Sequence, residues 1–265
     1  MKTFLNHIKN FINKFFDDGV PGIAAQTTFY FITAMFPLAI FIFSILSFIK
    51  ISPEQTMFFL LNALSPDAAA IIYELISSVP QNLAITITSG LLSLWSVSGA
   101  ISTISKALNQ FYDVTEDRHF LAVRFYGVIF TLLMIAAIIV TFGFLIFGTL
   151  IWDMISIHLL FSGIIWNITR FSIVILLVST VIGALYSIMP NKKLGFKMVL
   201  PGAVFTSVTW TISSFAFSFY VNNFSKYHVV YGGLTGIIIL ITWLYMTSYI
   251  ILIGGEFNSI RHENI

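Results

Sequence analysis

Long apolar runs without charge dominate the pattern of hydrophobic and polar positions along this chain. Gly19 to Ile49, for example, contains no charged residue. A membrane-crossing helix needs about 20 consecutive apolar residues, so each such run is long enough to cross. The pattern predicts six transmembrane helices, at about residues 23–49, 83–108, 125–152, 170–190, 199–222 and 232–255.

One further apolar stretch, segment 154–169, is uncharged but too short to cross a bilayer comfortably. It also contains His158, Gly163 and Asn167. We expect an interfacial or re-entrant connection here, and a seventh span is the alternative.

The N-terminal segment, residues 1–18, has the pattern of an amphipathic helix. Its apolar residues share one helical face, and its lysines lie on the other. This pattern predicts an interfacial helix with its lysines among lipid headgroups, or else a helix that packs on a partner or on the core. A cleaved signal peptide is not expected, because the first long apolar run begins only after Asp18.

Two short helices are predicted in segment 51–82, the longest connection between spans. Ser52-Pro53-Glu54 and Ser65-Pro66-Asp67 each resemble a helix start, with serine as N-cap and proline in the first turn. We expect both helices to lie on the external membrane surface.

The composition supports an all-α integral membrane protein. Of 265 residues, 58% are hydrophobic and 9% charged, whereas soluble domains contain roughly a quarter charged residues. No polar linker divides the sequence, which predicts a single membrane domain over residues 1–265. With the N-terminus inside, ten of the 13 Lys and Arg residues fall in cytoplasmic segments. The positive-inside rule therefore predicts cytoplasmic N- and C-termini.

No motif for an enzyme, metal or cofactor is apparent. The chain has no cysteine, and its five histidines are dispersed. Asp113, Glu116, Asp117 and His119 share one loop, which we interpret as solvated. The net charge of +2 is too small to indicate a nucleic-acid partner. We expect no enzymatic activity and no cofactor.

Ionisable residues are expected only near the ends of the spans. Lys106 lies near the cytoplasmic end of the second span and can extend to the interface. Glu256 follows Gly254-Gly255 at the cytoplasmic end of the sixth. Since a proton-driven transporter normally carries a carboxylate or histidine deep in the bundle, this distribution disfavours that class.

Uncharged polar residues are frequent within the spans, especially in the serine-rich second span. Small and hydroxyl residues permit tight helix packing, and they can equally line a polar cavity. Pro37 is expected to kink the first span. The candidate cavity or headgroup contacts are Gln26, Tyr30, Ser93, Ser96, Thr103, Lys106, Arg124, Thr209, Ser213 and Glu256.

Several stretches resemble the YihY/BrkB family of bacterial inner-membrane proteins. They occur in the family's order and cover most of the chain, and Arg124 lies where the family has an arginine before its third span. The matching stretches are AAQTTFYFITAMFPL, SGLLSLWSVSGAISTISKALNQFYDV, LYSIMPNKK, VLPGAVFTSVTW and, most specific, FAFSFYVNNFSKYHVVYGGLTGIIILITWLYMTSYIILIGGEFNS.

The resemblance implies six transmembrane helices, cytoplasmic termini and a bacterial cytoplasmic membrane. It implies little settled biochemistry. The family has carried a ribonuclease label, which the sequence does not support, and it is associated with envelope integrity and the movement of envelope lipids.

Three functions stay open from the sequence. The first is transport or flipping of a lipid or amphiphile, with membrane lipids as partners and Lys106, Arg118 and Arg124 attracting an anionic headgroup. The second is a small-solute channel or exporter. The third is a structural or scaffold protein with helices in 53–79 as its partner surface. The sequence specifies no oligomeric state.

Overall fold

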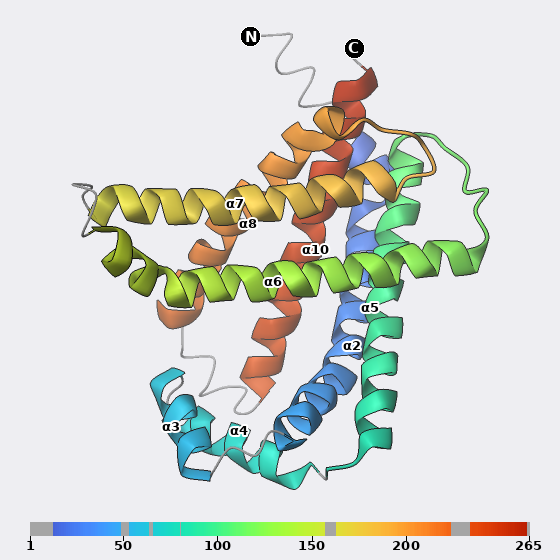
Figure 1. Cartoon of the computed structure of the whole chain (residues 1–265). Coiled ribbons are helices and arrows are strands. Elements are labelled where there is room, and N and C mark those ends of the chain that lie inside the picture. Colours follow the sequence, from blue (N-terminus) through green and yellow to red (C-terminus); the bar gives the residue numbers. More distant parts are fainter. Residues whose placement is uncertain are drawn as a thin grey trace. The chain divides into compact units, whose positions relative to one another are not determined.

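A computed structural model of the chain describes residues 13–48, 53–63, 66–79, 81–156, 163–223 and 234–263. Every regular element in these ranges is an α-helix (Figure 1). The helices are α2 (Val20–Phe48), α3 (Pro53–Ala63), α4 (Pro66–Ser78), α5 (Leu83–Phe111), α6 (Phe120–Ser156), α7 (Gly163–Ile188), α8 (Phe196–Asn223) and α10 (Leu234–Glu263).

Five of these helices are long and apolar enough to cross a membrane: α2, α5, α6, α8 and α10. They correspond to the first, second, third, fifth and sixth predicted spans. The predicted fourth span, 170–190, falls in α7, whose apolar stretch Ser172–Ile188 is shorter. The structure therefore supports a polytopic all-α membrane protein with five candidate spans, and the sixth stays a prediction.

The connection at 154–169 is built from two helix ends. Residues up to Ser156 continue α6, and α7 begins at Gly163. The described part of this segment thus extends two neighbouring helices.

The short elements at the start of the chain and after α2 are only partly described. The predicted amphipathic helix lies largely outside the described residues, although residues 13–17 are helical. The two helices predicted in 51–82 are confirmed as α3 and α4, which begin at Pro53 and Pro66. Proline suits a first helical position because its missing N–H has no intrahelical partner there.

The chain divides into two compact units, each described here by itself. The first comprises Met1–Phe29 and Ser98–Ile265, and the second comprises Tyr30–Val97. In the first unit, α7 packs against both α6 and α8, and α8 packs against α10. Figure 1 shows α6 and α7 side by side and antiparallel.

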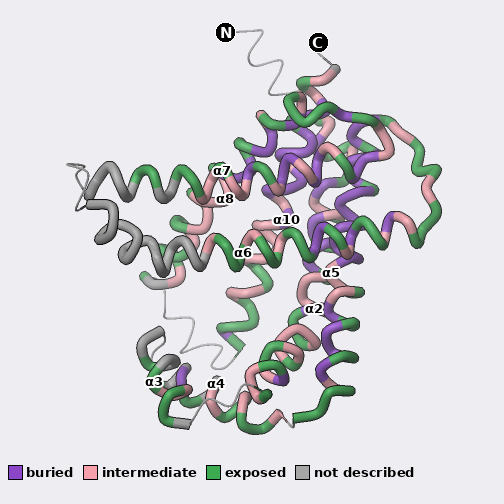
Figure 2. Tube along the Cα trace, viewed as in Figure 1, coloured by how far each residue is buried: buried purple, intermediate pink, exposed green. Residues whose placement is uncertain are grey.

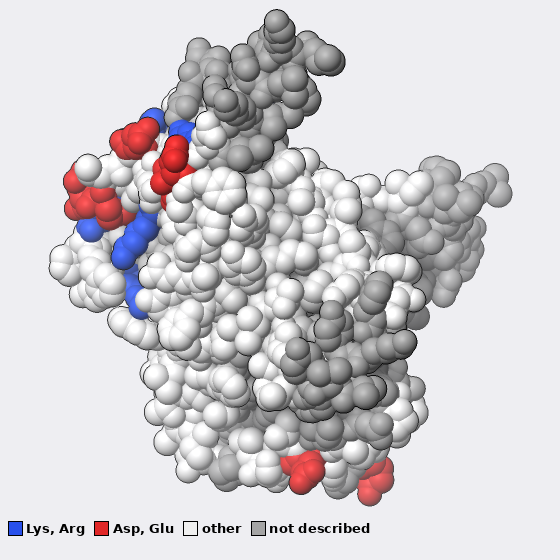
Figure 3. Space-filling view, turned by 180° about the vertical axis from the view of Figure 1, so that it is seen from behind, with Lys and Arg blue, Asp and Glu red and all other residues white. Residues whose placement is uncertain are grey.

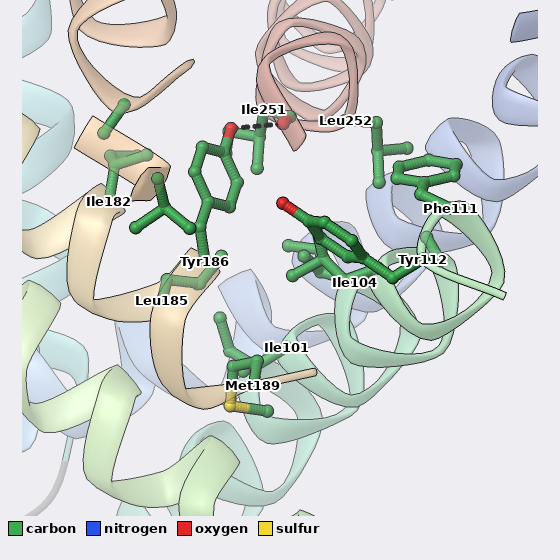
Figure 4. Packing of buried hydrophobic residues seen from close by; sticks show 14 of the residues in the cluster. Ile101, Ile104, Phe111, Tyr112, Ile182, Leu185, Tyr186, Met189, Ile251 and Leu252 are labelled. Atoms are coloured by element: carbon green, nitrogen blue, oxygen red, sulfur yellow. Dashed lines mark hydrogen bonds between the residues drawn. The ribbon is translucent and has the colours of Figure 1, made fainter. Parts of the chain in front are cut away.

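The buried core of the first unit is concentrated where α5, α7 and α10 end (Figure 2). Figure 4 shows this packing, in which Ile104, Tyr186 and Leu252 come from these three helices. By contrast, much of α6 exposes large apolar side chains such as Leu132, Ile138 and Ile139. A soluble protein rarely exposes contiguous apolar surface on this scale, whereas lipid is a compatible solvent for it.

In the second unit, α2 and α5 pack closely through small and hydroxyl residues. An added Cβ at Gly90 would come within 2.8 Å of the Phe41 ring. The hydroxyls of Ser44 and Thr86 are buried and hydrogen-bonded to each other. Small residues at such positions let membrane helices approach closely.

Candidate functional site: a polar junction at the helix ends

Four segments of the first unit meet through hydrogen bonds and form what we call the polar junction. These segments are residues 14–18, 105–118, 189–191 and 256–262. Lys14 Nζ donates to Phe111 O and to Ser259 Oγ, both at 3.3 Å. Gln110 Nε2 donates to Asp18 O at 3.1 Å. The segment before α2, the end of α5 and the end of α10 therefore lie together.

Two asparagines connect the loops that follow α5 and α7. The backbone N–H of Asn191 donates to Asn109 Oδ1 at 2.6 Å, and Asn109 Nδ2 donates to Glu116 Oε2 at 2.7 Å. Asn191 Nδ2 donates to Thr115 O at 2.9 Å. Asp113, two residues after the end of α5, has a φ of 51°. This is the left-handed conformation that commonly ends a helix.

Arg118 joins the same two loops by charge-assisted hydrogen bonds. Its guanidinium donates to Glu116 at 2.7 Å and to Met189 O at 2.6 Å. The hydrogen bonds from Arg118 hold the pKa of the Glu116 carboxyl below its usual range, although partial burial acts in the opposite direction. The pair therefore stays ionised at neutral pH.

The joint between α8 and α10 depends on the side-chain amide of Asn258. Asn258 Oδ1 accepts from Gly202 N at 2.8 Å, and its Nδ2 donates to Val199 O at 2.9 Å. Both backbone groups belong to the first turns of α8. Close by, the Tyr186 hydroxyl bonds Thr206 Oγ1 at 2.8 Å and donates to Ile251 O (Figure 4).

Glu256 is fully buried at the junction. Its carboxyl lies close to that of Asp18, which comes from the segment before α2. Glu256 lies near the end of α10, where the sequence expectation puts ionisable residues. Its burial could not be read from hydropathy, because the neighbouring segments that cover it are distant in sequence.

Arg124 lies much deeper along α5 than the sequence suggests. Its Nη1 donates to Ser98 Oγ at 3.1 Å. Ser98 lies 13 residues before Phe111, the last residue of α5, and at 1.5 Å per residue this is about 20 Å from the helix end. An added Cβ on Gly127 would come within 2.9 Å of Ser98 O, so α6 contacts α5 closely here.

The other predicted contact residues are spread over α2, α5 and α8. In the second unit, Ser93 is buried, whereas Tyr30 and Ser96 are half-buried. In the first unit, Thr103 is buried and donates to Gly99 O of its own helix at 3.0 Å. Thr209 and Ser213 are half-buried, and Gln26 and Lys106 are exposed. Of the ten predicted contact residues, Glu256 and Lys106 fall within the segments of the junction, and only Glu256 is buried there.

Sequence reasoning missed several junction residues, among them Asp18, Asn109, Asn191 and Asn258. A signal was nevertheless present. Asn109, Asn191 and Asn258 fall within the stretches ALNQFYDV, LYSIMPNKK and GGEFNS that carry the family resemblance. The junction is therefore where these separate stretches meet.

Most of the charged side chains visible in Figure 3 gather in one area next to a broad uncharged surface, and a few acidic side chains lie elsewhere. Within the described ranges, no group of three or more His, Asp or Glu residues is arranged to hold a metal ion. The junction is thus a network of carboxyl, amide, hydroxyl and basic groups.

Comparison with known proteins identifies the family. The family model described as Virulence factor BrkB matches residues 11–265. The chain belongs to the BrkB family. No solved structure matches it.

Relatives of this BrkB-family chain match it over most of their length. One, named putative ribonuclease-like protein YfkH from Bacillus subtilis (strain 168), is 34% identical over 91% of this chain and 89% of its own. A UPF0761 membrane protein of Aggregatibacter aphrophilus (strain NJ8700) is 26% identical over 96% and 91%. Another, from Haemophilus influenzae (strain 86-028NP), is 26% identical over 96% and 94%. With the five apolar helices, these relatives support a multi-pass membrane protein.

Proposed function

We propose that this chain moves a lipid or another amphiphile with an anionic headgroup across the bacterial cytoplasmic membrane. The observation that carries the proposal is the position of Arg124 about halfway along α5, bonded to Ser98. An arginine at membrane depth is costly and is usually retained for a function.

The chemistry around Arg124 suits an amphiphile. A guanidinium presents several donors in a planar fork that matches phosphate and carboxylate oxygens. Its neighbours Phe120, Leu121 and Phe125 are exposed apolar side chains. A phosphate headgroup would meet the cation at this position while its acyl chains contact the apolar flank.

We further propose that the polar junction faces the cytoplasm. Lys14, Arg118, Lys192, Lys193 and Arg261 lie in the segments at this end of the first unit. Basic residues are retained on the cytoplasmic side of short loops. This orientation agrees with the ten-to-three distribution of Lys and Arg predicted from the sequence.

The ribonuclease-like name of the Bacillus relative is not extended to this chain. At the junction, Arg118 donates to Glu116 and to a backbone carbonyl, and Lys14 donates to Phe111 O. These two basic groups serve internal contacts, and no arrangement of catalytic groups at the junction supports the name.

The test is reconstitution of the full chain into vesicles that contain fluorescent phosphatidylglycerol or phosphatidylcholine, with a panel of small solutes in parallel. We expect movement of the anionic lipid above protein-free vesicles. Arg124→Gln should slow it about tenfold, since a charge-assisted hydrogen bond contributes roughly 1.5–3 kcal/mol. Arg124→Lys should retain part of the rate. Lys193→Gln, in the exposed loop before α8, is the matched control and should leave the rate unchanged.

Absence of lipid movement above protein-free vesicles would overturn the proposal. Passage of solutes without lipid would favour a channel. Inactivity toward both would favour a scaffold role.

A further inference from the structure

Asp18 Oδ2 and Tyr112 Oη, two buried polar atoms close to Glu256, have no hydrogen bond to any described protein donor or acceptor. The same holds for His262 Nδ1, and the His262 ring lies 6.1 Å from the Tyr112 ring. Buried polar groups in proteins are nearly always hydrogen-bonded, so such a cluster calls for an explanation. Glu256 itself is fully buried, and the three residues come from the segment before α2, from the end of α5 and from α10.

The Asp18 and Glu256 carboxyls lie close enough to share a proton. Asp18 Oδ1 accepts from Gln110 Nε2 at 3.3 Å, and the Glu256 carboxyl lies beside the Asp18 carboxyl. An ionised carboxylate only accepts hydrogen bonds, so two carboxyls bond each other only when one of them is protonated. Two adjacent carboxyls in proteins characteristically share one proton for this reason.

We propose that Asp18 and Glu256 form a proton-binding site that holds one proton between their carboxyls and thereby fastens residues 14–18 to α10. Tyr112 is 7% exposed, its hydroxyl oxygen is buried, and Glu256 is close enough to interact with it electrostatically. The Tyr112 hydroxyl forms no hydrogen bond with another described side chain. It is therefore available as a donor to the Asp18–Glu256 pair. The site is independent of the substrate proposed above.

The charged and titratable groups around the pair favour a proton over a metal cation. Lys14 and Asp113 are charged neighbours of Asp18: Lys14 lowers the pKa of the Asp18 carboxyl and Asp113 raises it. Lys192 Nζ lies 5.5 Å from the centre of the Tyr112 ring, and the His262 ring is 6.1 Å from it. Tyr186, on α7, lies close enough to Tyr112 for an electrostatic interaction. With Lys14 beside the pair, a divalent cation would leave this buried site with an excess positive charge, whereas a shared proton leaves one negative charge that balances the lysine.

The direction of the pH dependence follows from the environment of Asp18. Burial raises the pKa of the Asp18 carboxyl, although Gln110 and Lys14 act in the opposite direction. A carboxyl whose pKa is higher in the folded than in the unfolded chain stabilises the fold below its unfolded pKa. This stabilisation is lost as the pH rises through the folded pKa. We therefore expect the folded chain to lose stability as the pH rises and the shared proton leaves.

The test uses the full-length chain purified in detergent, with its melting temperature measured from about pH 5 to about pH 9. The variants are Glu256→Gln and Asp18→Asn, each of which replaces one carboxyl by a neutral group that can donate. Asp17→Asn is the matched control, since Asp17 is the exposed neighbour of Asp18. The wild-type melting temperature should fall with rising pH, each junction variant should lose roughly half or more of that fall, and Asp17→Asn should retain it.

Infrared spectroscopy of the wild-type chain provides a second measurement that does not depend on folding of the variants. We expect a carbonyl band of a protonated carboxylic acid at neutral pH, which shifts in heavy water and disappears at high pH. Absence of this band would overturn the proposal. A wild-type pH profile that both junction variants reproduce would also overturn it.

Discussion

At the scale of single residues, glycine positions determine how closely α10 approaches its neighbours. A Cβ added at Gly254 would collide with Thr206 Oγ1 and would lie 2.7 Å from the Tyr186 hydroxyl oxygen. It would also lie 3.0 Å from Gly202 O. Because two of these contacts belong to α8, Gly254 permits the close α8–α10 contact from which Asn258 reaches the backbone of α8.

Gly254→Ala should destabilise the chain by about 1–3 kcal/mol, the usual cost of overpacking a well-filled interior. Gly236→Ala is the matched control on the same helix, since a Cβ there meets nothing within 4 Å. Alanine also forms helix better than glycine, so this control should be neutral or slightly stabilising. Thermal unfolding in detergent measures both. Equal melting temperatures for the two variants would contradict the proposed close contact.

The buried Glu256 shows how a single residue changes meaning between sequence and structure. In the sequence it is one carboxylate at the end of an apolar run. In the fold it is fully buried beside Asp18 and near Tyr112. Glu256 nevertheless lies near the end of α10, so its burial adds a protected carboxyl at the junction without placing one midway along a span.

At the scale of elements, α8 and α10 are joined by a side chain that bonds the backbone of the first turns of α8. Asn258 both accepts from Gly202 N and donates to Val199 O. The substitution Asn258→Ala would remove both hydrogen bonds, each of which contributes about 0.5–1.5 kcal/mol to stability.

We therefore expect Asn258→Ala to lower the melting temperature clearly. Asn223→Ala is the control: Asn223 is exposed at the other end of α8 and donates only to Phe219 O of its own helix. Surface substitutions of this kind usually change stability by less than about 0.5 kcal/mol. The same thermal measurement applies, and an unchanged melting temperature for Asn258→Ala would show that the joint does not stabilise the fold.

The serine-rich helix α5 also has a clearer role in the structure. Ser89, Ser93 and Ser102 are buried, and each donates to a carbonyl of its own helix, at 2.7, 2.9 and 2.8 Å. Hydroxyls that are satisfied within their own helix suit close packing of membrane helices. Of the two interpretations left open by the sequence, these contacts favour packing over a polar-lined cavity at these three positions.

At the scale of the whole molecule, the segments predicted to be cytoplasmic meet at one place in the first unit. Lys14, Gln110, Asn191 and Ser259 come from four such segments, and all take part in junction hydrogen bonds. A chain whose helices cross in pairs returns to the same side after each pair, and the junction agrees with this pattern.

Single cysteines test this topology directly, because the chain has no cysteine of its own. Lys193→Cys and Arg261→Cys, both exposed, should react with an impermeant thiol reagent only when the cytoplasmic side is accessible. Gln81→Cys, exposed between α4 and α5, should react from outside intact cells. Labelling of all three from the same side would contradict the predicted crossings.

The sequence by itself determined the class of the protein and most of its elements. Long uncharged runs require a membrane because no other solvent suits so much apolar surface, and hydropathy is a local property that can be read without the fold. The starts of α3 and α4 at Pro53 and Pro66 were also predictable, since helix initiation depends on a few neighbouring residues. The family was recognisable from ordered local stretches.

Only the tertiary structure decided which polar residues act together. The partners Asn258–Gly202, Arg118–Met189 and Asp18–Glu256 are separated by long stretches of sequence, and the depth of Arg124 depends on where α6 contacts α5. Hydrophobic periodicity indicates which face of a helix avoids water, but in a membrane apolar faces can meet either lipid or protein. Burial and pairing therefore had to come from the packing of the helices.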